Sequence, residues 1–131
     1  MPRPSTRPGS HDLAKEIAAF GSSNPGTIFL GVDDNGEIVG LQGVETVKNR
    51  DRLQTRVEGI CANSVSPPLI ARTSFEKYDG KRVLRIEVPK GPEPIYFSSD
   101  KPYVRHGSLS RPARPQEVTE LIRRWLARQP G

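Results

Sequence analysis

Two turn-forming dipeptides, Asn35-Gly36 and Asp79-Gly80, each lie between short runs of apolar and β-branched residues. Such dipeptides readily adopt the positive φ angles that a tight β-hairpin requires. Because a hairpin pairs its two strands antiparallel, these dipeptides constrain the fold more than any other feature of the chain. The four strands predicted in this way are residues 27–32, 37–41, 69–77 and 82–88.

Apolar residues that recur at spacings of three and four predict three helices. Gly21 is expected to end the first, since glycine accepts the left-handed conformation that closes many helices. Pro115 is expected to open the last, where its missing N–H costs no hydrogen bond. The helices are predicted at about residues 11–20, at 44–63 and from 115 onward, and two further extended pieces are predicted at 95–97 and 103–105.

These elements together predict an α+β fold: one domain in which a mixed, largely antiparallel β-sheet is packed with about three α-helices. A length of 131 residues suits a single domain. Residues 1–9 are rich in proline and arginine, and we expect them to form a flexible arm. The expected domain then covers residues 10–129.

The chain contains one cysteine and two histidines. These numbers exclude an internal disulfide and argue against a structural zinc site, which needs four such ligands. Cys61 lies among apolar residues and is predicted to be a buried, inert thiol. No apolar run approaches the roughly 18 residues of a membrane span, and the N-terminus lacks the apolar core of a secretory signal. We therefore expect a cytoplasmic protein with no membrane partner.

The net charge of +5 is unevenly distributed. Residues 101–131 carry a net +5 and residues 1–10 a net +2, whereas residues 11–100 carry a net −2. Clustered Lys and Arg favour a polyanionic partner, because the neutralisation of phosphates releases counterions. The alternative is a basic surface that is only solvated.

The segment at 101–108 combines an aromatic ring, cations, hydroxyls and a glycine. Tyr103 could stack on a base or ribose while Arg105 and His106 contact phosphates. Alternatively, Tyr103 packs in the core and Arg105 pairs with a surface carboxylate, and the sequence leaves both open. The residues predicted to contact nucleic acid are Lys101, Tyr103, Arg105, His106, Arg111, Arg114, Arg123, Arg124 and Arg128.

Asp33 and Asp34 precede the first turn dipeptide and are the candidates for acid chemistry. A calcium-binding EF-hand is not expected there, because both end ligands of its loop are absent. A P-loop fails because Val32 and Asp33 occupy the positions of its Lys and its Ser or Thr. A metal-dependent nuclease would need further carboxylates, which nothing nearby supplies. A structural role in the turn is therefore favoured.

The order of motifs resembles the Schlafen-type AlbA-like domain family. The similarity lies in Ala19-Phe20, in residues 26–41, in Pro94-Ile95-Tyr96 and in the Tyr-Val-Arg-x-Gly-Ser motif at 103–108, and it spans about residues 11–126. This resemblance implies an α+β domain that binds nucleic acid, in some members as part of a bacterial transcription regulator. Related Schlafen proteins are endoribonucleases that cut structured RNA with a metal-dependent carboxylate cluster.

The chain departs from that family at its start. Most members begin with an acidic strand, Glu-Ser-x-x-x-Glu-Phe-Lys, which supplies two of the catalytic acids, whereas residues 1–10 contain no carboxylate. By resemblance the third acid would be Asp33 or Asp34, and Asp12 and Glu16 do not match the motif. Either this chain binds without cutting, or it is a truncated form.

We therefore expect a non-catalytic nucleic-acid-binding module without a cofactor, directed to DNA or RNA, with DNA and transcription regulation favoured. One alternative is a metal-dependent endoribonuclease that uses Mg or Mn. Another is a protein-interaction or assembly domain. A missing edge strand would leave its neighbour unpaired, which also indicates a homodimer through that sheet edge.

Overall fold

The computed structural model describes residues 10–130 of the chain, with side chains from residue 12 onward. The arm expected at residues 1–9 lies outside this range. The elements are α1 (Ser10–Ser22), β1 (Gly26–Leu30), α2 (Val47–Asn63), β2 (Arg72–Tyr78), β3 (Lys81–Val88), β4 (Tyr96–Ser98), β5 (Lys101–His106), β6 (Leu109–Pro112) and α3 (Pro115–Arg128).

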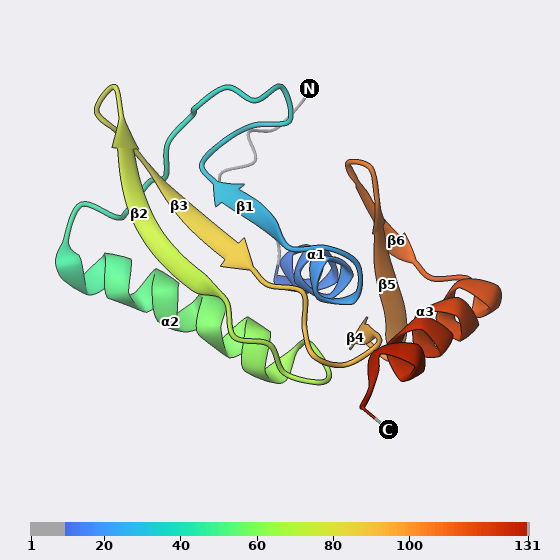
Figure 1. Cartoon of the computed structure of the whole chain (residues 1–131). Coiled ribbons are helices and arrows are strands. Elements are labelled where there is room, and N and C mark those ends of the chain that lie inside the picture. The colour runs from blue at the N-terminus through green and yellow to red at the C-terminus, as the bar shows by residue number, and fades with distance from the viewer. Residues whose placement is uncertain (1–9, 131) are drawn as a thin grey trace.

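Helix α1 lies between two small antiparallel sheets (Figure 1). One sheet has the strand order β1-β3-β2 and the other the order β4-β5-β6. Helix α2 runs alongside the first sheet, and α3 lies outside the second. The α+β fold with three helices and antiparallel strands is confirmed, with the strands divided between two sheets.

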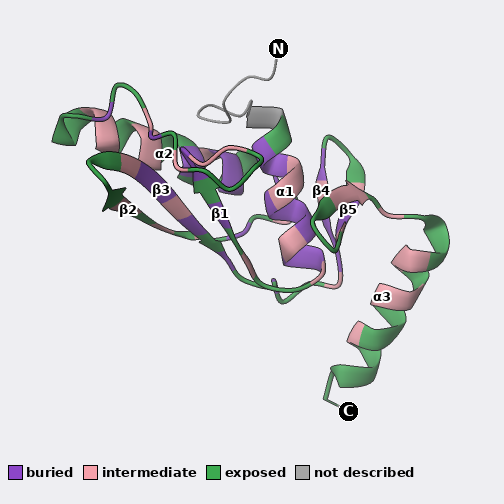
Figure 2. Cartoon of the chain, turned by 90° about the horizontal axis from the view of Figure 1, so that it is seen from above, coloured by how far each residue is buried: buried purple, intermediate pink, exposed green. Residues whose placement is uncertain are grey.

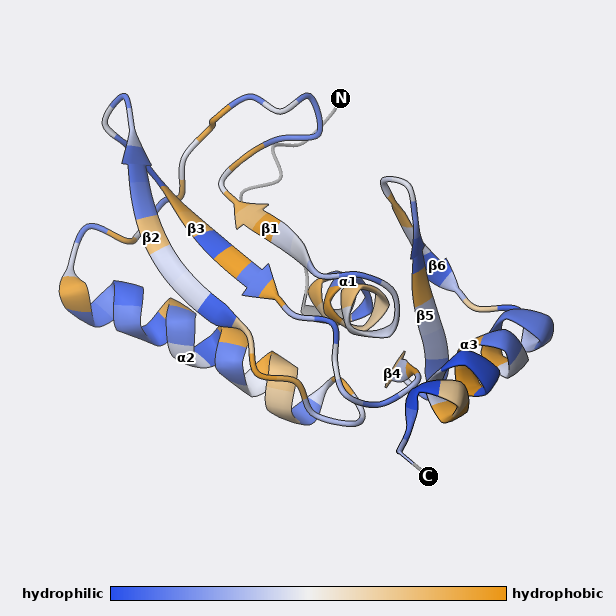
Figure 3. Cartoon of the chain, viewed as in Figure 1, coloured by the Kyte–Doolittle hydropathy of each residue, from blue (hydrophilic) through white to orange (hydrophobic). Residues whose placement is uncertain are grey.

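The core forms where α1 meets both sheets and α2. The apolar side of α1 is fully buried, and Ile17 has no exposed surface. Strand β3 alternates, with Leu84, Ile86 and Val88 turned into the core and Arg85 and Glu87 turned outward. Figure 3 shows this alternation along β3 as orange and blue bands, and Figure 2 shows that buried residues gather on α1 and the strands around it.

The second predicted hairpin is confirmed. Strands β2 and β3 pair in register from Arg72 with Glu87 to Tyr78 with Lys81. Asp79 and Gly80 form the turn, with φ angles of 50° and 76°. The outer face of this sheet is polar: the Tyr78 hydroxyl donates a hydrogen bond to Glu76, whose carboxylate also pairs with Arg85 at 3.4 Å.

The strand predicted at 37–41 does not form. This segment makes a single isolated bridge, between Val32 and Ile38, and stays beside β3 without forming a ladder with it. Its path is set by the carbonyl of Gly31, which accepts hydrogen bonds from the N–H groups of Val39 and Gly40 at 2.8 and 2.9 Å. Gly40 itself has a φ of 84° and a Cβ there would lie 3.0 Å from Lys81 Cβ, so this glycine serves a close backbone approach.

Two predicted helix ends also differ. Gly21 does not end α1, which continues through Ser22. A Cβ at position 21 would lie 2.5 Å from the Leu69 side chain, so the glycine allows close packing inside the helix. Helix α2 begins at Val47 and not at residue 44, because the Thr46 hydroxyl caps it by accepting a hydrogen bond from a backbone N–H. Cys61 is buried as predicted, and burial raises its thiol pKa.

Strand β6 was not predicted, because Leu-Ser-Arg-Pro has neither alternation nor β-branched residues. It forms against the edge of β5 and pairs with it in register from Tyr103 with Pro112 to His106 with Leu109. In the first sheet, β1 pairs only with β3 among the described strands. Strand β1 is thus one edge of that sheet and β2 is the other. The homodimer expected through an unpaired sheet edge stays a prediction.

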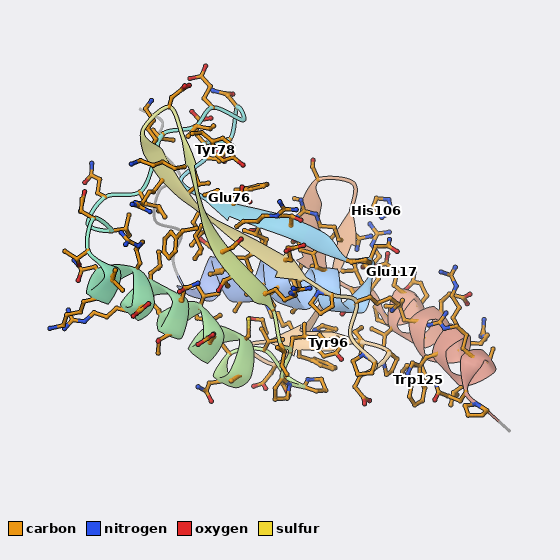
Figure 4. The ribbon with its side chains drawn as sticks, turned by 60° about the vertical axis from the view of Figure 1, so that its left-hand side comes forward. Glu76, Tyr78, Tyr96, His106, Glu117 and Trp125 are labelled. Atoms are coloured by element: carbon orange, nitrogen blue, oxygen red, sulfur yellow. The ribbon has the colours of Figure 1, made fainter. Side chains whose placement is uncertain are left out.

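Helix α3 is attached to the body at its two ends. The Arg111 guanidinium on β6 donates two hydrogen bonds to the Glu117 carboxylate, at 2.8 and 2.6 Å. The Trp125 indole N–H donates to the Pro92 carbonyl at 2.6 Å. Figure 4 shows Glu117 and Trp125 at these positions on α3. The apolar stripe expected along this helix is not buried: Leu126 is 59% exposed and Ile122 38%.

The junction between α1 and β4 depends on one buried hydroxyl. The Tyr96 N–H donates to Ser22 Oγ at 2.7 Å, and both residues are almost completely buried. We predict that Ser22→Ala destabilises the fold by about 1–3 kcal/mol, because it leaves a buried N–H without an acceptor. Urea unfolding measures this change. Ser74→Ala, on an exposed part of β2, should stay within about 0.5 kcal/mol of the parent.

The attachment of α3 through the Glu117 carboxylate is expected to weaken in acid. Hydrogen bonds from Arg111, and then from the Arg114 N–H, lower its pKa from 4.5 to about 2. The ionised form is therefore favoured in the folded state, and its contribution is lost as the pH falls from 4.5 towards 2. We predict that Glu117→Gln makes the free energy of unfolding less pH-dependent over this interval. Glu58→Gln, an exposed change on α2, should retain the parent's dependence.

Candidate functional site

Three exposed arginines of the C-terminal third lie on α3: Arg123, Arg124 and Arg128. Arg123 and Arg124 share one carboxylate, that of Glu120, at 2.9 and 3.1 Å. Their side chains are 71% and 64% exposed, so these ion pairs lie in water and are weak and screened by salt. A phosphate can replace such a partner at little cost. Arg128, one turn beyond Arg124, is also exposed.

Lys90 joins this cationic surface from the loop before β4. Burial lowers its pKa, and the nearby positive charge of Arg128 lowers it further. Its ammonium donates to the Ser22 carbonyl at 3.4 Å. Two cations that influence each other in this way raise the local positive potential, which favours an anionic ligand. Sequence reasoning missed Lys90, because Lys90 and Arg128 are far apart in the chain and only the fold brings them together.

Tyr103 and Arg105 follow the second of the two alternatives that the sequence left open. Tyr103 is 5% exposed and belongs to the core, so its ring is not accessible for stacking on a base. Arg105 pairs with Glu16 at 3.6 Å and lies 4.6 Å from the centroid of the Phe20 ring. It also donates to Ser110 Oγ at 2.9 Å. Arg105 therefore joins β5 to α1 and β6.

The remaining predicted contacts do not form one cluster. Lys101 and His106 are exposed at opposite ends of β5, about 17 Å apart for a strand of this length. Arg111 is occupied by Glu117. Arg114 is exposed and precedes α3, where its backbone N–H donates to Glu117.

Asp33 acts as the turn residue that the sequence favoured. Its Oδ1 accepts hydrogen bonds from the N–H groups of Asn35 and Glu37, both at 2.9 Å. Such side-chain contacts mimic a backbone turn and stabilise the reversal of the chain. Asp33 therefore has a structural role in the loop after β1.

A separate groove of about 570 Å³ collects three other acids, Asp12, Glu16 and Asp34. It lies between α1, β1 and the β5–β6 hairpin. Burial raises the pKa of Glu16, and Asp12 and Asp34 add to this effect, whereas Arg105 opposes it. Sequence reasoning set Asp12 and Glu16 aside because they do not match the family motif. Within residues 12–130, however, no three Asp, Glu, His or Cys side chains are placed to hold a metal ion.

The described part of the chain contains no helix that is both long and apolar enough to cross a bilayer.

Comparison with known proteins places the chain in a family. No curated protein matches. A crystal structure of the DIP2311 protein from Corynebacterium diphtheriae is similar, with a TM-score of 0.65 and 24% identity over 94% of this chain, which supports the fold alone. This chain covers 21% of that protein's length. The family model described as Schlafen, AlbA_2 matches residues 3–114, most of the sequence. The chain therefore belongs to the Schlafen AlbA_2 family.

Proposed function

We propose that this domain binds nucleic acid through the exposed cations of α3 and Lys90. The observation that carries the proposal is that Arg123, Arg124 and Arg128 are all exposed on α3, outside the packed core, and that the charge of Arg128 reaches Lys90. Membership of the Schlafen AlbA_2 family, which fits a nucleic-acid-binding role, supports it. Binding at such a surface is largely electrostatic, because each phosphate contact releases condensed counterions.

The geometry of α3 suits contact with a phosphate backbone. Arg124 and Arg128 are four residues apart and so lie on one side of the helix, about 6 Å apart along its axis. Neither is needed to hold the helix on the body, which is the role of Arg111 and Trp125. These side chains are therefore free to reorganise around a ligand without loss of the fold.

The finer proposal is that the ligand is DNA and that the domain is a non-catalytic part of a transcription regulator in the cytoplasm. The resemblance to family members that form part of such regulators supports it. The exposed position of the cations on a projecting helix is also compatible with the shape of a duplex. Arg105 and Arg111 are left out of the proposed contact surface, because ion pairs with Glu16 and Glu117 hold them in structural roles.

The double change Arg124→Glu and Arg128→Glu tests this surface. We predict that it weakens binding to duplex DNA by at least about tenfold and lowers the slope of log affinity against log salt by about 2, with little dependence on base sequence. Fluorescence anisotropy at several salt concentrations measures both quantities. RNA and single-stranded DNA, tested in parallel, show which nucleic acid the domain prefers.

The matched control is Arg72→Glu with Lys77→Glu. These residues are exposed on β2, and the change alters the net charge by the same amount. The control should bind much like the parent. Equal weakening in both double variants would mean that only total charge matters, and unchanged binding in the α3 variant would contradict the proposal. Recovery of uncut strands in the presence of Mn²⁺ is expected for a non-catalytic domain.

A further inference from the structure

A pocket of about 620 Å³ lies between α2, the end of β1 and the loop at 41–44. Its size is typical of small-molecule sites. Figure 1 shows that α2 and α3 lie on opposite sides of α1, so this pocket is separate from the cations of α3. Aliphatic side chains form its floor and walls: Leu13, Leu30, Leu41, Val44, Leu53, Val57 and Ile60.

The pocket is held in shape by hydrogen bonds at its loop. The Leu41 N–H donates to the Arg82 carbonyl of β3 at 2.8 Å. At the other end, the Arg50 guanidinium donates to the carbonyls of Val44 and Glu45 at 2.9 and 3.1 Å. Because the loop is tied to both β3 and α2, a ligand meets a preformed site and little ordering is needed on binding.

A stripe of cations on α2 runs beside the pocket. Lys48, Arg52 and Arg56 are exposed and are spaced four residues apart, so they form a stripe along one side of α2, about 12 Å long. Arg52 and Arg56 also line the pocket itself. The site therefore combines an apolar floor with a positively charged track, which suits a ligand that has an apolar part and several negative charges.

Two amide side chains complete the wall. Gln42 lies on the loop and Asn49 on the first turn of α2, and both line the pocket. Each amide offers donors and an acceptor, the groups that read the edge of a nucleobase. A simple aliphatic carboxylate would use neither two amides nor a stripe of three cations.

We propose that this pocket receives one unstacked base of a single-stranded nucleic acid, while the α2 stripe of Lys48, Arg52 and Arg56 holds the flanking phosphates. That the ligand is a nucleic acid rests on the proposed function. The site itself is a second one and does not use α3. The base lies on the aliphatic floor and its edge meets Asn49 and Gln42. The domain would then distinguish unpaired from fully paired strands.

A single-stranded DNA of about twelve nucleotides, with one 2-aminopurine and a terminal dye, tests the proposal. Dye anisotropy reports total binding, and 2-aminopurine emission rises when that base leaves the stack. We expect the parent to raise the emission. Asn49→Ala should remove most of this rise and weaken binding about tenfold. This change keeps the cap of α2, because the Thr46 hydroxyl accepts from the backbone N–H of residue 49.

Arg52→Ala with Arg56→Ala should weaken strand binding and lower its salt slope by about 2. Arg72→Ala with Lys77→Ala is the control of equal charge and should behave as the parent. Thermal unfolding confirms that each variant is folded. The proposal is overturned if the strand binds the parent without a rise in emission, or if the rise persists in both pocket variants.

A titration with adenosine 5′-monophosphate separates failure of the pocket from failure of the proposed function. If no strand binds the parent, nucleic-acid binding fails as the function, and the nucleotide then tests the pocket alone. Changes in the amide NMR signals of residues 41–44 and 49–60 that vanish in Asn49→Ala would support the base site. If octanoate produces those changes and the nucleotide does not, the base site is overturned.

Discussion

The burial of α1 between two sheets is the constraint on which the rest of the structure depends. A three-stranded sheet is stable only when one face packs against another element, and both sheets here use the same helix. The helix meets this demand with Leu13 and Ile17 as its large buried residues and with small ones, Ala14, Ala18 and Ala19, beside them. Small side chains let strands approach closely on both sides, and Gly21 extends this close packing to Leu69 and Tyr96.

The central position of α1 explains where the other elements can carry function. Once α1 has filled the space between the sheets, α3 has no core to enter, and none of its residues is buried. It is held by a few directed contacts, and its cations therefore point into solvent. Helix α2 does enter the core through Val57 and Cys61. The loop before it is tied to β3 and to α2 by hydrogen bonds, and an apolar pocket lies between them, beside exposed arginines.

On the polar side of α1, an arginine compensates a partly buried carboxylate near the core. Glu16 is partly buried and close to two other acids, a situation that by itself disfavours ionisation. Arg105 compensates from β5, and its guanidinium also lies over the Phe20 ring. An arginine within a family motif is thus used to hold two parts of the fold together. The cations most suited to binding lie elsewhere, on α3 and α2.

The sequence by itself determined the class of the fold, most of the elements, the family and the turn role of Asp33, because hydrophobic periodicity and turn dipeptides act over a few residues. It did not show that 37–41 fails to form a strand, that Gly21 lies inside a helix or that β6 forms. Each of these depends on a contact outside the segment: with Gly31 and Lys81, with Leu69, and with β5. The candidate site likewise divides into what the sequence determined and what only the tertiary structure decided. The positive charge of the C-terminal third was evident from the sequence. Only the tertiary structure decided that Tyr103 is buried, that carboxylates hold Arg105 and Arg111, and that Lys90 lies near Arg128. The reason is that pairing and burial are set by contacts between residues far apart in the chain.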